Sequence, residues 1–336
     1  MSKVMRENLA SKKIAIWLLA TTIPLFQPRA EAQQPPKVFK IGWLESGPTV
    51  RGTRSGEIFV RRLGELGYVE GKNIVFEYRS ANNKLDGLPA LAQELVRLNV
   101  DVLVTGASPA AIAAKNATKS IPIVFTILAD PIAEGLIDSL ARPGGNITGL
   151  TNISAELGGK RLELLKETVP KLSRVAVLWD PKNSGSAQSW KDLQQPAKAL
   201  GWQLYSMEVS SAGKFEAAFK DALKARSAAL FVTPMILATS HRKQVVELAA
   251  KHRLPAIYSR ELFVESGGLM SYGADLDDHY LRAAIYVDKI LKGTKPADLP
   301  VEQPTKFELL LNLKTAKTLG LTIPPMVLMR ATKVVK

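Results

Sequence analysis

Short apolar runs alternate with longer amphipathic stretches along most of this chain. The stretch 100–131 shows the pattern: residues 102–104 are apolar and end near Gly106, an alanine-rich stretch covers 110–117, and a second apolar run covers 121–127. Continuous apolar runs of this length are typical of strands that are buried on both faces. The order of these segments therefore predicts two parallel strands joined by a crossover helix.

The same unit recurs in two series, each of a size to form one sheet. In the first series we expect strands at 38–44, 73–78, 102–104, 121–127 and 147–150, and helices around 58–66, 88–98, 110–117 and 132–140. In the second we expect strands at 174–179, 202–209, 229–233 and 256–259, and helices at 156–168, 187–200, 214–225 and 238–252. A strand at 269–272, a helix at 276–291 and a strand at 307–312 follow. This alternation predicts an α/β fold of two similar lobes with parallel sheets.

In such sheets, ligands bind at the edge where the strands have their carboxyl ends. Ser108 and Pro109 follow one predicted strand, where a hydroxyl at the N-cap and a proline at the first helical position favour the start of a helix. The unpaired N–H groups of that helix would point at the same edge and could receive an anion. We therefore expect a binding site at this edge.

The first 32 residues have the pattern of a secretory signal peptide. Lys12 and Lys13 precede an apolar run at 14–26, and Ala30 and Ala32 stand at the two positions that determine cleavage. We expect cleavage after Ala32 and export to the periplasm; a retained N-terminal anchor is the alternative. The apolar run is shorter than the roughly 20 residues that span a bilayer.

Composition removes several classes of site. The chain has no cysteine, which excludes disulfides, thiolate metal sites and cysteine nucleophiles. Its formal net charge is +14, but the basic residues are spread along predicted helices beside acidic ones, so we expect a solvated basic surface and no nucleic-acid partner. The three histidines, His241, His252 and His279, fall on predicted helices among charged residues, and we expect them to be solvated. The common glycine-rich, nucleophile-elbow and zinc motifs of α/β enzymes are absent, so we expect no cofactor, no metal and no catalysis.

The predicted strand ends and the segments beside them carry small and polar residues that suit an amino acid. Hydroxyls and helix N–H groups would receive a carboxylate, an aspartate an ammonium, and an aromatic ring the apolar part. The candidate ligand-binding residues are Ser46, Gly106, Ala107, Ser108, Thr126, Asp130, Asn152, Trp179, Asp180, Asn183, Thr233, Tyr258 and Asp275.

Some of these candidates have a structural alternative. Asp130 and Asp180 each precede a proline and can equally be turn or cap residues. Trp179 can be core packing rather than a pocket wall. Arg51 and Arg54, in the loop after the first strand, can contact a ligand carboxylate or be solvated.

The chain resembles a bacterial family of ABC-transporter substrate-binding proteins that includes the tryptophan- and tyrosine-binding types. The resemblance runs from about residue 38 to the end; its most specific phrases are RPGGNITG (142–149) and KPADLPVEQPTKFEL (295–309), with GYVEGKNIVFEYRSA (67–81) and VLVTGASPAAIAAKNAT (102–118) also similar. It implies a type I periplasmic-binding fold, with two Rossmann-like lobes, three crossovers, a ligand in the cleft and hinge closure.

On this chain, the resemblance implies crossovers near 151–153, 273–276 and 297–304. The N-terminal lobe would then be 37–151 plus 276–297, and the C-terminal lobe 152–275 plus 298–336. The implied partners are a small-molecule ligand and an ABC permease in the inner membrane, with the chain itself a monomer. Two alternatives stay open: a ligand-sensing domain of the same fold, and an exported enzyme that uses Asp130 and Asp180 as acid and base.

Overall fold

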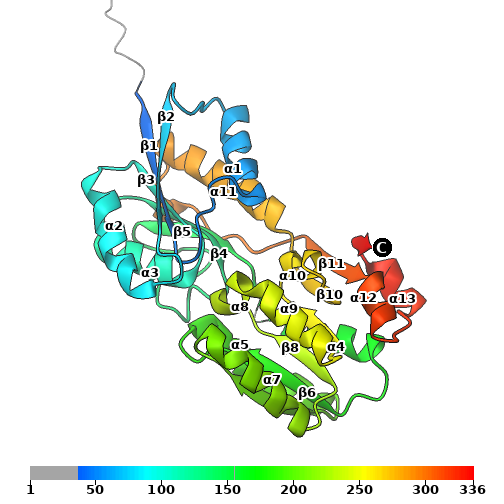
Figure 1. The fold of residues 1–336 in the computed structure, drawn as a ribbon. Helices are drawn as coiled ribbons and strands as arrows, with labels where there is room; N and C mark the ends of the chain where they lie inside the picture. The colour runs from blue at the N-terminus through cyan, green and yellow to red at the C-terminus, as the bar shows by residue number, and fades with distance from the viewer. Residues whose placement is uncertain (1–36, 155) are drawn as a thin grey trace, which may run out of the picture. The chain divides into compact units, whose positions relative to one another are not determined.

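The computed structural model describes residues 37–154 and 156–336, coloured along the chain in Figure 1. The predicted signal peptide and its cleavage after Ala32 lie outside the described residues. Within the described ranges, no helix has the length and apolar character needed to span a membrane.

One parallel sheet is built from the first five strands, in the spatial order β2-β1-β3-β4-β5. The strands are β1 (Phe39–Glu45), β2 (Ile74–Ser80), β3 (Val102–Thr105), β4 (Ile123–Leu128) and β5 (Ile147–Thr151). Three of them, β3, β4 and β5, carry almost only buried side chains, as strands covered on both faces must. The apolar runs of the first series are thus confirmed as strands.

Helices cover both faces of this sheet. The helices are α1 (Arg54–Glu65), α2 (Leu88–Arg97), α3 (Ser108–Ala117) and α11 (Leu276–Leu291), with a short 3-10 turn, η1 (Leu85–Gly87). One apolar cluster joins α1 and α11 to the sheet, and another joins α2 and α3 to it. We call the five-stranded sheet with these helices the first lobe.

A second sheet has the strand order β12-β11-β10-β9-β8-β6-β7 and is parallel except for the pair β10–β11. Its strands are β6 (Arg174–Trp179), β7 (Gln203–Glu208), β8 (Ala229–Val232), β9 (Ala256–Tyr258), β10 (Met270–Ala274), β11 (Phe307–Asn312) and β12 (Lys333–Val335). The fold class, an α/β fold of two mostly parallel sheets, is as expected from the sequence.

The second sheet also carries helices. They are α4 (Gly158–Thr168), α5 (Ser184–Asp192), α6 (Gln194–Ala199), α7 (Phe215–Lys224), α8 (Ile236–Ser240), α9 (Arg242–Lys251), α10 (Glu261–Glu265), α12 (Leu313–Thr318) and α13 (Pro325–Arg330), with a 3-10 turn η2 (Ala212–Lys214). A further 3-10 turn, η3 (Pro296–Asp298), lies against β5 of the first sheet. Two apolar clusters join these helices to the sheet. We call the seven-stranded sheet with α4–α10, α12 and α13 the second lobe.

The chain passes between the two sheets three times. It leaves the first sheet after Thr151, returns between Ala274 and Leu276, and leaves again after Glu302, which pairs with Leu150 beside β5. The expected crossovers match these passages. The exact lobe boundaries given above remain a prediction.

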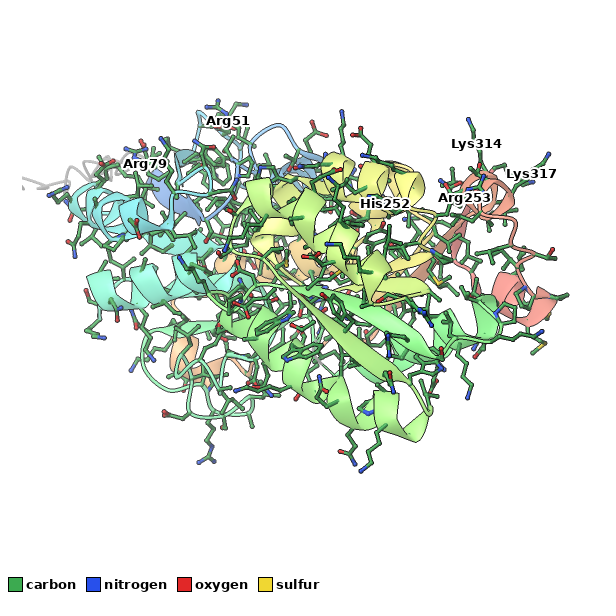
Figure 2. The ribbon with its side chains drawn as sticks, turned by 60° about the horizontal axis from the view of Figure 1, so that its bottom comes forward. Arg51, Arg79, His252, Arg253, Lys314 and Lys317 are labelled. Atoms are coloured by element: carbon green, nitrogen blue, oxygen red, sulfur yellow. The ribbon has the colours of Figure 1, made fainter. Side chains whose placement is uncertain are left out.

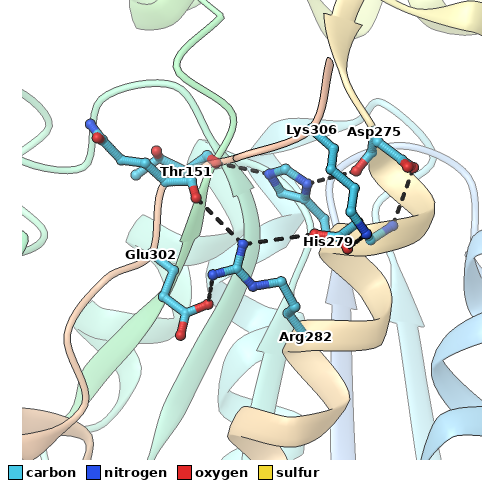
Figure 3. A network of polar contacts seen from close by, with 8 residues as sticks. Thr151, Asp275, His279, Arg282, Glu302 and Lys306 are labelled. Carbon is cyan, nitrogen blue, oxygen red and sulfur yellow. Dashed lines mark hydrogen bonds and ion pairs between the residues drawn. The ribbon is translucent and has the colours of Figure 1, made fainter. Parts of the chain in front are cut away.

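A polar network holds two of these passages together (Figure 3). The His279 ring lies between two backbone carbonyls: Nε2 is 2.8 Å from the Thr151 oxygen and Nδ1 is 2.9 Å from the Asp275 oxygen. Next to it, Arg282 pairs with Glu302 of the third passage. The expected solvation of His279 is therefore wrong, because the ring is 1 % exposed and packs where β5 meets α11.

The other two histidines are also less solvated than expected. His241 and His252 are half-buried, and their rings lie against Phe215 and Phe219. The flat faces of the two imidazole rings explain this placement, because such a face can cover apolar surface while the ring nitrogens stay at the edge of the ring.

A buried arginine braces the second lobe beside the first two passages. Arg161 of α4 donates from Nε to the Tyr272 carbonyl, from Nη1 to the Ser154 carbonyl and from Nη2 to the Ser154 hydroxyl, at 2.7 to 2.8 Å. One planar guanidinium thereby ties the chain after β5 to strand β10.

Three predicted helices differ from the structure. Residues 132–140 form turns, with Gly135 at φ +66°, a left-handed conformation that ends any helix there. The expected helix at 187–200 is α5 and α6, because Pro196 has no N–H for a continuous helix and lies in the first turn of α6. The helix at 238–252 is α8 and α9, divided at the non-helical His241.

Basic side chains lie on both lobes, as Figure 2 shows for Arg51 and Arg79 in the first and Arg253, Lys314 and Lys317 in the second. Several other basic side chains pair with acids on their own helix, at 2.9 Å for Lys160–Glu163 and for Lys224–Asp221. Exposed pairs of this kind contribute little stability and keep the surface solvated.

Candidate functional site

A cavity of about 470 Å³ is lined by residues of both lobes. In the first lobe, its wall includes the ends of β1 and β4, the turn between β3 and α3, and the start of α11. In the second lobe, it includes the turns after β6, β8 and β9. Because parallel strands all end at one edge of their sheet, the two carboxyl edges form opposite walls of this cavity.

Five of the predicted site residues line the cavity. They are Gly106, Ala107 and Ser108 from the turn before α3, Asn152 from the chain after β5, and Asn183, the N-cap of α5. The structure thus brings together residues from the first lobe, the first passage and the second lobe.

Four other predicted residues are buried behind the wall. The Ser46 hydroxyl accepts a hydrogen bond from the Ala110 N–H, and the Thr126 hydroxyl donates to the Thr105 carbonyl. The Thr233 hydroxyl donates to the Leu178 carbonyl, and the Tyr258 ring stacks on Phe263 at 4.5 Å. None of these four is among the residues that line the cavity.

The remaining four predicted residues also lie outside the lining. Each aspartate accepts a backbone N–H of its own turn: Asp130 from Ala133, Asp180 from Lys182 and Asp275 from Asp278. Trp179 stacks on Trp190 at 5.6 Å and donates to the Ser206 hydroxyl. The three carboxylates are therefore engaged in local turns.

The start of α3 differs in detail from the expectation. The N-cap is Ala107, and Ser108 is the first helical residue. The Ser108 hydroxyl donates to Oε1 of Glu134 at 2.6 Å, and the Ser184 hydroxyl, from the second lobe, lies 3.4 Å from the same oxygen. Burial raises the pKa of Glu134, while the two serine hydroxyls oppose that rise. A carboxylate of the chain itself thus lies beside the expected anion position.

One carboxylate of the cavity wall that sequence reasoning missed is Glu45, at the end of β1. Its Oε1 accepts a 2.7 Å hydrogen bond from the Trp43 indole N–H, two positions earlier on the same face of the strand. Burial raises the pKa of Glu45 to about 7, although the Trp43 hydrogen bond and the charge of Arg260 favour ionisation. The alternation of Trp43 and Glu45 at a strand end was the signal available in the sequence.

Arg260 lies on the opposite wall, at the N-cap of α10. Its Nε is buried without a hydrogen-bond partner, and within the described ranges its guanidinium forms no ion pair. Tyr280 of α11 completes this part of the wall; its ring stacks on Trp43, and burial raises the pKa of its hydroxyl, which stays protonated.

Four other charged side chains at the cavity pair with each other, whereas Arg242, Glu261 and Glu265 line it without an ion pair in the described ranges. Arg54 forms an ion pair with Asp277, and Lys333 pairs with Glu308 at 2.9 Å. Arg51 lies over the Tyr78 ring, 5.5 Å from its centre. Of the two arginines that the sequence left open, Arg54 lines the cavity with its charge already compensated, and Arg51 does not line it.

Apolar side chains supply the rest of the wall. Val50, Ile127 and Leu276 come from the first lobe, and Met235 and Leu262 from the second. A wall that combines acidic and basic groups with a large apolar part fits an amphipathic organic molecule of modest size. Within 37–154 and 156–336, no cluster of three or more potential metal ligands is found.

The lobes also contact each other directly beside the cavity. The Ser240 hydroxyl of α8 donates to Asn83 Oδ1 of the first lobe at 3.0 Å, and Ser184 lies against Glu134. These hydrogen bonds join side chains of the two lobes.

Comparison with known proteins points to one family. A family model for ABC transporter substrate binding proteins matches residues 43–335. A tyrosine-binding protein of Clostridioides difficile is 29% identical over 282 residues, which is 84% of this chain and 80% of that protein.

Three solved structures superpose on most of this chain. A conserved domain protein of Vibrio cholerae superposes with a TM-score of 0.83 at 29% identity, and an ABC domain from Streptococcus pneumoniae in complex with L-Trp with 0.81 at 26%. The ligand-free, open structure of a substrate-binding protein from Clostridium difficile gives 0.67 at 26%. All three comparisons cover 89% of this chain and 100% of the other.

Proposed function

Because the chain belongs to the family of ABC transporter substrate-binding proteins, we propose that it is the exported component of an importer that binds an amino acid or a related carboxylate. The observation that carries this proposal is the cavity between the carboxyl edges of two sheets, with walls from both lobes. A ligand held there contacts both lobes at once, which is what couples binding to a change in their arrangement.

The ligand class is supported by the wall and by the relatives. The wall combines polar groups of both charges with apolar side chains, and two relatives are described with tyrosine and tryptophan. Of the residues predicted from the sequence, we propose that Gly106, Ala107, Ser108, Asn152 and Asn183 contact the ligand. The other eight predicted residues then lie behind the cavity wall or in the turns that carry it.

The mechanism we propose is hinge closure. Open lobes admit the solute, rotation about the three passages closes the cavity, and the closed form is presented to a permease in the inner membrane. Two findings support this. The lobes contact each other through Ser240 and Asn83, and the chain superposes better on the L-Trp complex than on the open, ligand-free structure.

The remaining parts of the proposal concern the cell. We propose that the leader is removed after Ala32, that the mature chain acts in the periplasm as a monomer, and that it needs neither cofactor nor nucleic acid. The family membership supports a solute that is carried unchanged.

Isothermal titration of the mature chain with a panel of amino acids and simple carboxylates tests this function. We expect at least one member to bind with one site per chain, and mass spectrometry to recover it unchanged. If the whole panel fails to bind while another metabolite class does, the ligand class is wrong. A solute recovered in altered form would show that the chain is an enzyme.

A further inference from the structure

We propose that Glu45 receives a cationic amine of the ligand and Arg260 its anionic group, so that the substrate class is a zwitterionic amino acid rather than a carboxylate alone. This inference rests on the proposed function and narrows it. It assigns one charge of the ligand to each lobe.

The Glu45 carboxylate is held in place by its neighbours. Trp43 donates to Oε1 at 2.7 Å, and the Trp43 ring is itself fixed by an edge contact with Phe59 at 4.7 Å. On the other side, a Cβ added to Gly106 would lie 2.5 Å from Oε2 of Glu45. The lack of a side chain at Gly106 is therefore what leaves room for the carboxylate in this position.

This carboxylate has no protein cation within ion-pair distance in the described part of the chain. Within the described ranges, no Lys, Arg or His forms an ion pair with Glu45, and Trp43 is the one side chain that donates to it. Burial without a counter-ion disfavours the ionised form, in line with the raised pKa of Glu45. A ligand ammonium placed here would supply the missing charge through a strong charge-assisted hydrogen bond.

Arg260 presents the matching situation on the other lobe. Its Nε is buried without a partner, and its charge acts on Glu45 from beyond ion-pair distance. A ligand carboxylate would give this guanidinium the acceptor that the chain itself does not supply. The two unpaired charges thus face each other across the space for a zwitterion.

The other titratable groups around Glu45 do not fill this role. Tyr280 of α11 stays protonated, and Arg54 is neutralised by Asp277. Arg242 of α9 also lines the cavity, but its Nη1 already donates to the Thr239 carbonyl at 3.5 Å, and its charge is not among those that act on Glu45. Glu261 and Glu265 of α10 lie on the same wall as Arg260; a carboxylate cannot receive the anionic group, and Glu265 is exposed.

Other carboxylates are engaged as well. Glu134 already accepts hydrogen bonds from the hydroxyls of Ser108 and Ser184. Asp130, Asp180 and Asp275, the aspartates expected to receive an ammonium, each accept a backbone N–H instead. Glu45 is therefore the acid best placed to receive an ammonium in this cavity.

Titration calorimetry on the mature chain tests the assignment. The probes are L-tyrosine, L-tryptophan and L-leucine, each against its analogue without the amine: 3-(4-hydroxyphenyl)propionate, indole-3-propionate and 4-methylpentanoate. We expect the tightest-binding amino acid to exceed its analogue by more than tenfold in affinity. The wild-type affinity should rise from pH 6 to pH 8, with proton release on binding, because the ammonium binds the ionised carboxylate.

The variant Glu45→Gln should lose most of this discrimination and its pH dependence, while Glu57→Gln, which removes an exposed carboxylate of α1, should retain both. Arg260→Met should weaken binding of the amino acid and of its analogue alike. Equal affinity for amino acid and analogue in the wild type, or an unchanged pH profile in Glu45→Gln, would overturn the inference. Failure of every probe and of the wider panel would instead overturn the proposed function.

Discussion

Glu45 and Gly106 depend on each other at the level of single atoms. The carboxylate occupies the space that a side chain at position 106 would take. Neither residue is unusual in the sequence alone, since a glutamate at a strand end and a glycine in a turn are both common. Asp130, Asp180 and Asp275 were easier to select from the sequence, because each lies in a polar turn. The backbone N–H groups of those same turns donate to their carboxylates.

Substitution of Gly106 tests this dependence. In Gly106→Ala the new methyl group would displace the Glu45 carboxylate, so we expect the affinity for an amino acid to fall about tenfold, or ~1.4 kcal/mol, with little change in stability. Titration calorimetry and thermal unfolding measure the two quantities. The control is Gly159→Ala, outside the cavity lining, where the added Cβ makes ordinary contact at 3.7 Å with Pro196. Equal losses in both variants would refute the specific role of Gly106.

The raised pKa of Glu45 also predicts how stability depends on pH. Because the pKa rises from 4.5 to about 7, the folded chain binds this proton more tightly than the unfolded chain. The stability that this proton contributes is therefore fully present below pH 4.5. It is lost as the pH rises from there to about 7, at up to ~1.4 kcal/mol per pH unit. Urea unfolding of ligand-free protein at pH 5 and pH 7.5 should show a smaller difference for Glu45→Gln. An identical difference in both proteins would contradict the burial of this charge.

At the scale of elements, helix starts and turns position the site more than the helix interiors do. The turn before α3 and the N-cap of α5 face each other across the cavity, and Glu134 lies between their first residues. Sequence periodicity found most of these helices, because their apolar faces repeat at helical spacing. It failed where a local break decides the element, as at Pro196, His241 and Gly135.

The contact between α8 and the first lobe predicts a kinetic effect. Ser240→Ala removes the 3.0 Å hydrogen bond to Asn83 that forms only when the lobes meet. We expect faster ligand release, by about two- to fivefold, with an unchanged association rate, because one exposed hydrogen bond contributes about 0.5–1 kcal/mol. Stopped-flow fluorescence measures both rates. Ser211→Ala, an exposed serine without a capping bond, is the control; a release rate equal to wild type in Ser240→Ala would show that this contact does not hold the lobes.

On the scale of the whole molecule, the three passages explain why one chain can form two sheets and still move as a clamp. The alternation of strands and helices predicted the two sheets, and the resemblance to a known family predicted the three passages. The network around His279 and Arg161 could not be predicted, because its acceptors are backbone carbonyls, which every residue carries. The placement of Glu45 and Arg260 on opposite walls of the cavity was also out of reach, since it follows from the lobe arrangement alone.

The central claim is that an amino acid closes the two lobes on each other. Since the chain has no cysteine, introduced ones can be labelled without background. We would place a fluorescent pair at Lys84→Cys in the first lobe and Lys243→Cys in the second, both at exposed positions, with Lys84→Cys and Lys119→Cys as the control pair within one lobe. The account predicts that saturating amino acid raises energy transfer between the lobes and leaves the control pair unchanged. Binding of the amino acid with no change between the lobes would contradict it.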